Sequence, residues 1–316
     1  MATAPGSRSQ PDFWIIAATL GILAIGVVMV YSASAVAAFR EYGDAFYYLK
    51  RQLLFAAMGL AAMYAAMNVD YRRWKKWAVP GLIACFALLC LVLVPGVGVV
   101  RGGARSWLGI GSFGIQPSEF MKLAMIVFLA RYLSERQLPA LAVLGAAFGL
   151  IMLQPDLGTG AVMIGASLMV IYAAGARIAH LAALGLLGLA GLAALIAAAP
   201  YRLQRIIAFL DPWQDPQGAG YQAIQSLYAV GPGGLLGLGL GMSRQKYGYL
   251  PEPPTDFIFS ILAEELGFVG GALLILLFLL LVWRGMRTAI AVADPFGSFL
   301  AAGIVAIFAV QVLINI

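Results

Sequence analysis

Charge is scarce in this sequence. Of its 316 residues, only 11% are Asp, Glu, Lys or Arg, whereas 62% are hydrophobic. Soluble domains carry roughly a quarter of their residues as charged side chains. The composition therefore argues against a soluble globular protein and favours a membrane protein.

Cysteine and histidine are scarcer still. The chain has two cysteines, Cys85 and Cys90, and a single histidine, His180. These residues provide neither a disulfide framework nor the ligand spacing of a metal site. We expect the two cysteines to be small apolar packing residues on different faces of one helix.

Long apolar runs are abundant instead. Nine stretches approach the length of about 20 residues that crosses a bilayer as a helix. They are residues 13–35, 52–68, 77–95, 118–133, 138–153, 158–174, 179–199, 257–283 and 296–316. The sequence therefore predicts an all-α, polytopic membrane helix bundle with nine spans, which forms a single integral membrane domain over residues 1–316.

Positive charge is unevenly distributed along the chain. The net charge is +6, and the segment 70–77, DYRRWKKW, places four basic residues between two predicted spans. By the positive-inside rule this cluster is cytoplasmic. That assignment puts the N-terminus inside and the segments 36–51, 96–117, 154–157 and 200–256 outside. No base-reading chemistry accompanies the charge, so we expect no nucleic-acid partner.

The segment 200–256 is the longest predicted loop, and long loops commonly carry function. Residues 201–213 and 221–231 are typical of amphipathic helices at the membrane interface. The glycine-rich run that follows, GPGGLLGLGLGMSRQK, lacks the Gly-Lys-Ser/Thr ending of a nucleotide-binding loop. Two interpretations remain: a flexible or re-entrant turn, or close approach of the backbone to a bulky ligand beside Arg244 and Lys246.

Three predicted spans begin with similar residues. Their entrances are QPSE at 116–119, QPD at 154–156 and PPTD at 253–256. Proline suits a first helical turn, and Ser, Thr and Asp cap free backbone N–H groups. One interpretation is that each acid simply caps its helix. The other is that three positive helix ends converge on one anionic ligand outside the membrane.

Basic residues near these entrances favour the second interpretation. Arg101 and Arg105 precede the fourth span, and their planar guanidinium groups suit phosphate. Lys122 lies one turn below Glu119, within the bilayer boundary, where an ionisable residue indicates a functional site. Glu119 and Asp156 are its expected neighbours, and simple pairing with Glu119 is the alternative.

Acids also occur at the start of the eighth span. Asp256, Ser260 and Glu264 follow the spacing of one helix face, with Glu265 adjacent. We expect Asp256 at the boundary between membrane and water, where a carboxylate stays ionised and reaches a substrate. Glu264 and Glu265 lie deeper and are expected to pair with a basic residue.

Six segments together resemble a known family, the shape, elongation, division and sporulation (SEDS) polymerases, which comprise FtsW, RodA and the stage V sporulation protein E. The segments occur in the family's order, from about Asp12 to the end of the chain. They are MNVDY, RGGARSWLGIG, IQPSEFMKLA, QPDLGTG, GPGGLLGLGLG and LPEPPTDFIFSILAEELGF.

The resemblance implies a ten-helix bundle in the plasma membrane with both termini in the cytoplasm. It implies polymerisation of lipid II into glycan strands on the outer face, together with a class B penicillin-binding protein and other membrane proteins of division or elongation. The family continues with a tenth helix, whereas this chain stops at Ile316, so the domain is C-terminally incomplete relative to the family.

The resemblance also implies a set of site residues. Asp256 matches the family's essential aspartate and is the expected general base. Residues at motif positions that line the family's outer cavity are Arg101, Arg105, Lys122, Gln154 and Asp156. With Glu119, Arg244, Lys246 and Glu264 from the residue analysis, they form the predicted substrate-binding set for lipid II and undecaprenyl-diphosphate-linked glycan.

The implied reaction inverts the donor sugar and needs no nucleotide, since the donor carries its own leaving group. A divalent cation such as Mg²⁺ is an additional candidate for stabilising that leaving group. Two other functions fit the polar residues: a flippase that moves lipid II across the membrane, and a non-catalytic scaffold for a transpeptidase. The sequence does not distinguish among roles in division, cell shape and sporulation.

Overall fold

The computed structural model describes residues 11–101, 104–110, 113–135, 140–197, 207–208, 210–251 and 254–316. Each of the nine predicted apolar stretches forms a helix within this part of the chain. The helices are α1 (Phe13–Tyr42), α2 (Tyr47–Met67), α3 (Arg72–Leu93), α4 (Pro117–Ser134), α5 (Ala140–Met152), α6 (Leu157–Ala173), α7 (Ile178–Ala197), α10 (Ile258–Ala291) and α11 (Pro295–Asn315).

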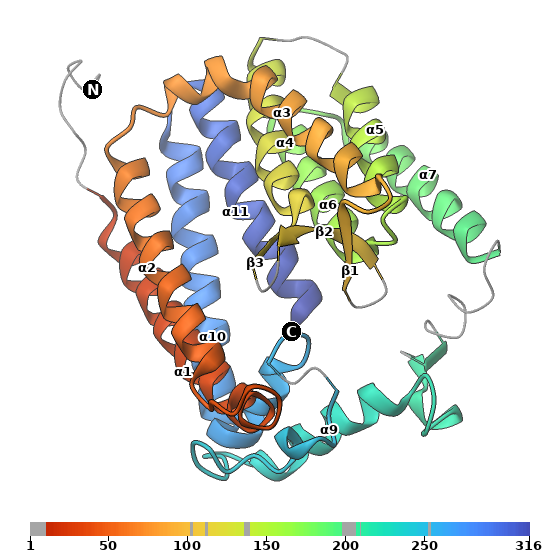
Figure 1. The fold of residues 1–316 in the computed structure, drawn as a ribbon. Coiled ribbons are helices and arrows are strands. Elements are labelled where there is room, and N and C mark those ends of the chain that lie inside the picture. Colours follow the sequence, from red (N-terminus) through yellow and green to blue (C-terminus); the bar gives the residue numbers. More distant parts are fainter. Residues whose placement is uncertain are drawn as a thin grey trace. The chain divides into compact units, whose positions relative to one another are not determined.

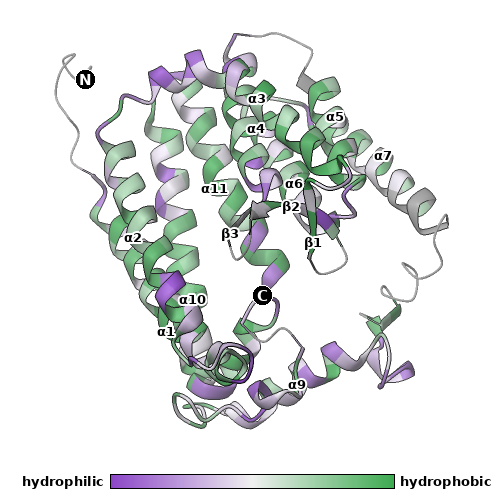
Figure 2. Ribbon diagram, viewed as in Figure 1, coloured by the Kyte–Doolittle hydropathy of each residue, from purple (hydrophilic) through white to green (hydrophobic). Residues whose placement is uncertain are grey.

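Four of these helices, α1, α3, α10 and α11, are long and apolar enough to cross a membrane by length and composition. The shorter helices α5 and α6 are also apolar. Figure 2 shows hydrophobic residues along most of the helical surface. The mostly helical architecture is therefore that of a membrane bundle, as predicted, while the number of spans stays a prediction.

Local signals define where several helices begin and end. Asp12 caps α1, because its carboxylate accepts the backbone N–H of Trp14 at 2.9 Å. Asp294 caps α11 in the same way, directly before Pro295 at the first helical position. At the other end of α1, Gly43 adopts the left-handed conformation, with φ of 70°, which terminates the helix.

The chain divides into two compact units, and Figure 1 labels the elements that they contain. Unit 1 comprises Met1–Asn68, Gly185–Leu281 and Asn315, and holds α1, α2, the long loop after α7 and most of α10. Unit 2 comprises Val69–Leu184, Val282–Ile314 and Ile316, and holds α3 to α6 and almost all of α11.

The core of unit 2 is apolar and is built from α3, α4, α5, α6 and α11. Its fully buried side chains include Leu89, Met121, Met125 and Met163. On α4, burial extends along Met125–Ala130 without interruption, because neighbouring helices cover that helix on several sides. This core fixes the first turns of α4 and α6, where predicted site residues lie.

Unit 2 also contains a small antiparallel sheet that the sequence analysis did not predict. Its strands are β1 (Gly98–Arg101), β2 (Ala104–Ile110) and β3 (Phe113–Ile115), in the order β1-β2-β3. Residues 96–117 were expected to form an outer loop. The pairing of Gly98 with Leu108 and of Leu108 with Ile115 instead folds that segment into two successive hairpins.

In unit 1 the long loop carries short helices. Helix α9 (Tyr221–Gly233) confirms the predicted helix at 221–231. The predicted helix at 201–213 falls largely outside the described residues. The same loop contains two short 3-10 helices, η1 (Pro212–Gln214) before α9 and η2 (Gln245–Tyr247) after it. The loop is therefore folded along much of its described length.

Helix α10 is broken at Gly267, where φ is 65° and ψ is −164°. In a regular helix the N–H groups of Phe268 and Val269 would donate to the carbonyls of Glu264 and Glu265. The break separates these four groups. Within a membrane span each one would lack a partner, at a cost of several kcal/mol per group.

The glycine-rich segment after α9 supplies all four missing partners. Leu238 and Gly239 donate their N–H groups to the carbonyls of Glu264 and Glu265, at 2.9 and 3.0 Å. In return, Phe268 and Val269 donate to the carbonyls of residues 234 and 235, at 2.8 and 3.1 Å. We call this four-bond pairing of residues 234–239 with the broken helix the backbone clasp.

Glycine is required in the clasp because two backbones approach without room for side chains. A Cβ on Gly237 would collide with the carbonyl of Glu265, and a Cβ on Gly267 would collide with the backbone N of Gly237. Gly237 also has a φ of 81°, which L side chains rarely adopt. The close approach that these glycines allow is to α10, whereas the predicted approach of the glycine run to a bulky ligand stays a prediction.

We predict that Gly237→Ala destabilises the protein more than Gly241→Ala. Both glycines have nearly the same φ, 81° and 80°, but a Cβ on Gly241 would meet open space. The shared conformational cost is about 1–2 kcal/mol, so Gly241→Ala should show that cost alone. Thermal unfolding in detergent measures both variants, and equal melting temperatures would contradict the clasp.

Candidate functional site

Asp256 lies in an exposed turn directly before α10, which begins at Ile258. The sequence analysis placed Asp256 and Glu264 on one helical face; in the structure only Glu264 is helical. Within the described residues, no hydrogen bond or ion pair involves the Asp256 carboxylate. The side chain is therefore accessible to a ligand, and its position is set by the backbone of the turn.

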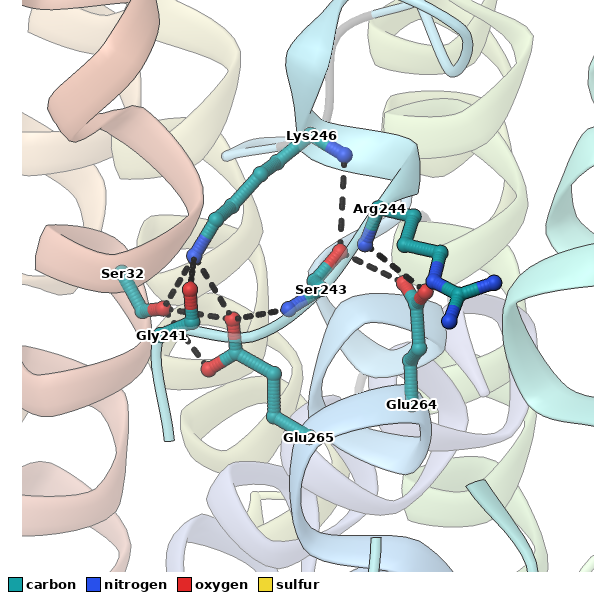
Figure 3. A network of polar contacts seen from close by, with 7 residues as sticks. All are labelled: Ser32, Gly241, Ser243, Arg244, Lys246, Glu264 and Glu265. Carbon is teal, nitrogen blue, oxygen red and sulfur yellow. Dashed lines mark hydrogen bonds and ion pairs between the residues drawn. The ribbon is translucent and has the colours of Figure 1, made fainter. Parts of the chain in front are cut away.

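Deeper along α10, Glu265 is the centre of a buried polar network (Figure 3). Its carboxylate accepts hydrogen bonds from the Ser32 hydroxyl of α1 at 2.7 Å and from the Lys246 ammonium at 3.0 Å. The backbone N–H of Ser243 donates to the same carboxylate at 3.3 Å. All of these side chains are buried, so the negative charge is compensated by one cation and by neutral donors.

Glu264 holds the adjacent part of the loop. Its carboxylate accepts from the Ser243 hydroxyl and, at 2.8 Å, from the backbone N–H of Arg244. The Arg244 residue is exposed, and Figure 3 draws only its backbone N–H bonded to Glu264. Glu264 was predicted to bind substrate, and that role stays a prediction; its observed contacts are with the loop that presents Arg244.

The Lys246 ammonium has three contacts inside the chain. It donates to the Gly241 carbonyl at 2.6 Å, to Glu265 at 3.0 Å and to the Ser32 hydroxyl at 3.3 Å. An ammonium group has three donors, so all three have partners in the chain. The structure thus pairs Lys246 with one of the two deep acids, which were expected to meet a basic residue.

In unit 2 the first turns of α4 and α6 are bonded to each other. Gln116, directly before α4, donates its side-chain amide to Asp156 at 2.7 Å, and the Ser118 hydroxyl lies 3.5 Å from the same carboxylate. Asp156 also caps α6 by accepting the backbone N–H of Thr159 at 3.1 Å. Capping, which was one interpretation of these entrances, is therefore present at Asp156. Convergence of three helix ends on one anionic ligand stays a prediction.

Lys122 of α4 is buried and makes an ion pair one turn away. Its ammonium lies 2.9 Å from the Glu119 carboxylate and donates to the Gln311 side chain of α11 at 2.9 Å. The exposed fraction is 3% for the Lys122 side chain and 47% for that of Glu119. The pairing with Glu119 that was one interpretation is present, and the acid still has access to solvent.

The remaining predicted site residues are also in unit 2. Gln154 is fully buried and donates its amide to the Leu89 carbonyl at 3.2 Å, while its side-chain oxygen has no partner within the described residues. Arg105 lies on β2 with an exposed side chain. Arg101 ends β1, and its side chain lies outside the described part of the structure.

Sequence analysis missed several members of these networks. Ser32, Ser243 and Gln311 were not considered as site residues. Ser32 and Gln311 had a signal, since a polar residue within an apolar helix requires a partner, whereas Ser243 lies in the loop. The partner itself could not be read from spacing, because Ser32 and Glu265 are 233 residues apart in the chain.

The apolar helices, the broken span and the buried charge networks are features of a polytopic membrane protein. The family model FTSW_RODA_SPOVE, described as a cell cycle protein, matches residues 13–316. The chain belongs to this FtsW/RodA/SpoVE family and is a multi-pass membrane protein.

Curated relatives are similar over nearly the whole chain. Stage V sporulation protein E of Bacillus subtilis (strain 168) is 57% identical, over 98% of this chain and 87% of that protein. A protein of Geobacter sp. (strain M18), named as a probable peptidoglycan glycosyltransferase FtsW, is 43% identical, over 96% of this chain and 86% of its own length.

Solved structures agree with the fold. A chain from a peptidoglycan synthase complex that coordinates polymerisation and crosslinking aligns with a TM-score of 0.75 and 31% identity, covering 96% of this chain and 85% of that one. The rod shape determining protein RodA of Thermus thermophilus aligns with a TM-score of 0.69 and 29% identity, covering 96% and 83%.

We predict an asymmetry between the two partners of the α4 ion pair. Glu119→Ala leaves the buried Lys122 ammonium without a counter-charge, which typically costs about 3–5 kcal/mol. Lys122→Met leaves a half-exposed carboxylate that water solvates, so its cost should be smaller. Thermal unfolding of both variants in detergent tests this, and a larger loss for Lys122→Met would contradict the observed burial.

Proposed function

We propose that this protein is a peptidoglycan glycosyltransferase that polymerises lipid II into glycan strands on the outer face of the plasma membrane. The observation that carries the proposal is an exposed carboxylate, Asp256, at the start of a membrane-spanning helix in a chain 43% identical to a protein named as this enzyme. Both substrates keep their lipid tails in the bilayer, so a reacting group at the membrane boundary is where the chemistry requires it.

The relative direction of two helices supports an outer location for Asp256. Ser32 of α1 contacts Glu265 of α10, whereas Gly21 of α1 lies beside Leu277. The two helices are therefore antiparallel, and α10 begins at the membrane side where α1 ends. With the N-terminus in the cytoplasm, as the basic loops indicate, the turn that holds Asp256 is outside.

The proposed reaction forms one glycosidic bond with inversion at the donor sugar. The 4-hydroxyl oxygen of the acceptor GlcNAc attacks the anomeric carbon of the donor MurNAc. The bond from that carbon to the diphosphate breaks, and its electron pair leaves with undecaprenyl diphosphate. Asp256 takes the hydroxyl proton as general base, for which an exposed carboxylate is suited.

Cationic groups would stabilise the departing diphosphate. Arg105 and Arg244 are exposed and are assigned this role, together with Arg101. Lys122, in the first turns of α4, would contribute a further cation. The other predicted substrate-binding residues nearby are Glu119 on α4 and Gln154 and Asp156 before α6. A divalent cation such as Mg²⁺ stays an additional candidate for stabilising this charge.

The proposed partners follow from the same assignment. A glycan polymer requires crosslinking, and a class B penicillin-binding protein would supply that transpeptidase activity beside this enzyme, within the membrane machinery of division, elongation or sporulation. The relatives at 57% and 43% identity carry sporulation and FtsW names, and both settings use the same lipid-linked substrate.

We predict that Asp256→Asn abolishes polymerisation without unfolding the protein. The side chain is exposed and the change is nearly isosteric, so the melting temperature should stay within a few degrees of wild type, while polymer formation falls at least about 100-fold. Gel analysis of products from purified lipid II measures activity.

The two other candidate functions, a scaffold and a flippase, predict different results in these assays. Normal polymer from Asp256→Asn would remove this residue from the mechanism and favour a scaffold. Translocation of lipid II in vesicles, with no polymer from the wild-type protein, would identify a flippase instead.

We also predict that Arg105→Ala raises the KM for lipid II by about 10-fold, which corresponds to one charge-assisted contact, with no change in melting temperature. Its matched control is Lys76→Ala, which removes an equally exposed cation from the predicted cytoplasmic cluster. Steady-state polymerisation rates at varied lipid II measure both. The same KM change in the two variants would mean that net charge, rather than a specific phosphate contact, is responsible.

A further inference from the structure

The segment that leads to Asp256 is held at its start by the polar network. Lys246, in η2, contributes its ammonium to the bonds with Ser32, Gly241 and Glu265. Its backbone N–H lies 3.4 Å from the Ser243 hydroxyl, which in turn is bonded to Glu264. The chain from 241 to 246 therefore has directional contacts with both α1 and α10.

A second, apolar anchor follows four residues later. Leu250 is fully buried and packs in one cluster with Met29 and Ala33 of α1 and with Ile261 and Leu262 of α10. The chain leaves this cluster at Leu250 and re-enters it at the first turns of α10. The turn that holds Asp256 is thus fixed on both sides by contacts with the same two helices.

The first turn of α10 has one more link to the loop. The Ser260 hydroxyl lies 2.7 Å from the Ser226 hydroxyl of α9, and Tyr221 of α9 donates its hydroxyl to the carbonyl of Tyr249 at 2.8 Å. These bonds hold α9 against the chain before and after Asp256. Since the Asp256 carboxylate itself has no partner within the described residues, its position depends on this backbone scaffold.

We propose that the buried Lys246–Glu265 pair, with Ser32 and Glu264, positions the turn of Asp256 for catalysis. The inference rests on the proposed function of Asp256 and adds to it a set of positioning residues on α1, η2 and α10. The hydrophobic contribution of Leu250 resists separation but is non-directional. The charged and hydrogen-bonded network has specific directions, so it sets the register between the loop and α10.

The proposal gives Lys246 a role other than substrate contact. Its three donors are all used inside the chain, whereas the neighbouring Arg244 side chain is exposed. Glu264 accepts the Arg244 backbone N–H at 2.8 Å, so the network also sets the point from which that guanidinium extends. One buried network thus positions the proposed base and one proposed phosphate ligand.

The mild test compares two serines of α1 in the full chain. Ser32→Ala removes the hydroxyl that bonds Glu265, whereas Ser34→Ala removes a hydroxyl of another buried serine, which donates to the Val30 carbonyl of its own helix. We expect Ser32→Ala to lower kcat about 10-fold with KM unchanged, since misplacement by ~1 Å can cost about 100-fold. Ser34→Ala should keep the wild-type kcat.

The stronger test is Glu265→Gln, which removes the counter-charge of Lys246. At a temperature where the variant is fully folded, we expect kcat to fall about 100-fold. Loss of activity that tracks the melting temperature in both Ser32→Ala and Glu265→Gln would indicate a merely structural role and overturn the proposal. A wild-type kcat in Ser32→Ala would overturn it as well.

A distance measurement separates this inference from the proposed function. Nitroxide labels at Thr255→Cys and at Leu273→Cys on α10, with Cys85 and Cys90 replaced by alanine, report the position of the turn by pulsed electron paramagnetic resonance. Ser32→Ala and Glu265→Gln should broaden the distance distribution, and Ser34→Ala should not. An unchanged distribution would overturn the positioning role even if Asp256→Asn is inactive, whereas an active Asp256→Asn would remove the proposed base.

Discussion

The break at Gly267 sets the main physical constraint on unit 1. A helix that opens inside a membrane exposes backbone donors and acceptors that lipid cannot satisfy. The chain meets this constraint because residues 234–239 lie against the break. Their backbone groups pair with the two free donors and the two free acceptors of α10. This requirement explains why the segment is rich in glycine and why it lies against α10 rather than in water.

Buried charge follows the same logic. Glu264, Glu265 and Lys246 would be costly in lipid as isolated groups, yet each has partners that satisfy its charge or its donors. Replacing such a network with apolar residues is often neutral for stability, so its presence in this fold calls for a function. Directional bonds that set the register of a loop are one such function, because apolar packing alone does not set it.

Much of the architecture could be predicted from side-chain patterns. Apolar length located all nine helices, and amphipathic spacing located α9. The break in α10 was not predictable in this way, because residues 257–283 read as one predicted span and side-chain periodicity does not report a single backbone angle. The sheet was missed for a related reason: strands of three to seven residues leave little alternation to detect.

The candidate site was predictable in its residues more than in its contacts. Asp256 was placed near the start of a span, and the deep acids were expected to meet a cation. The identity of that cation, Lys246, depends on how a loop folds back against α10, which is a tertiary property. Gln116 likewise bonds to Asp156, 40 residues later in the chain, and thereby links α4 to α6. Sequence spacing does not reveal such a contact.

The two parts of α10, before and after the break at Gly267, differ in how readily each would insert into a membrane during synthesis. Residues 268–283 contain no charged side chain and approach the shortest length that spans a bilayer, whereas the preceding piece carries two glutamates. The later piece can therefore enter lipid by itself as the nascent chain is inserted. The acidic piece finds its partners only in the folded chain, where the glycine segment and Lys246 bond to it. We therefore expect this part of unit 1 to assemble after insertion.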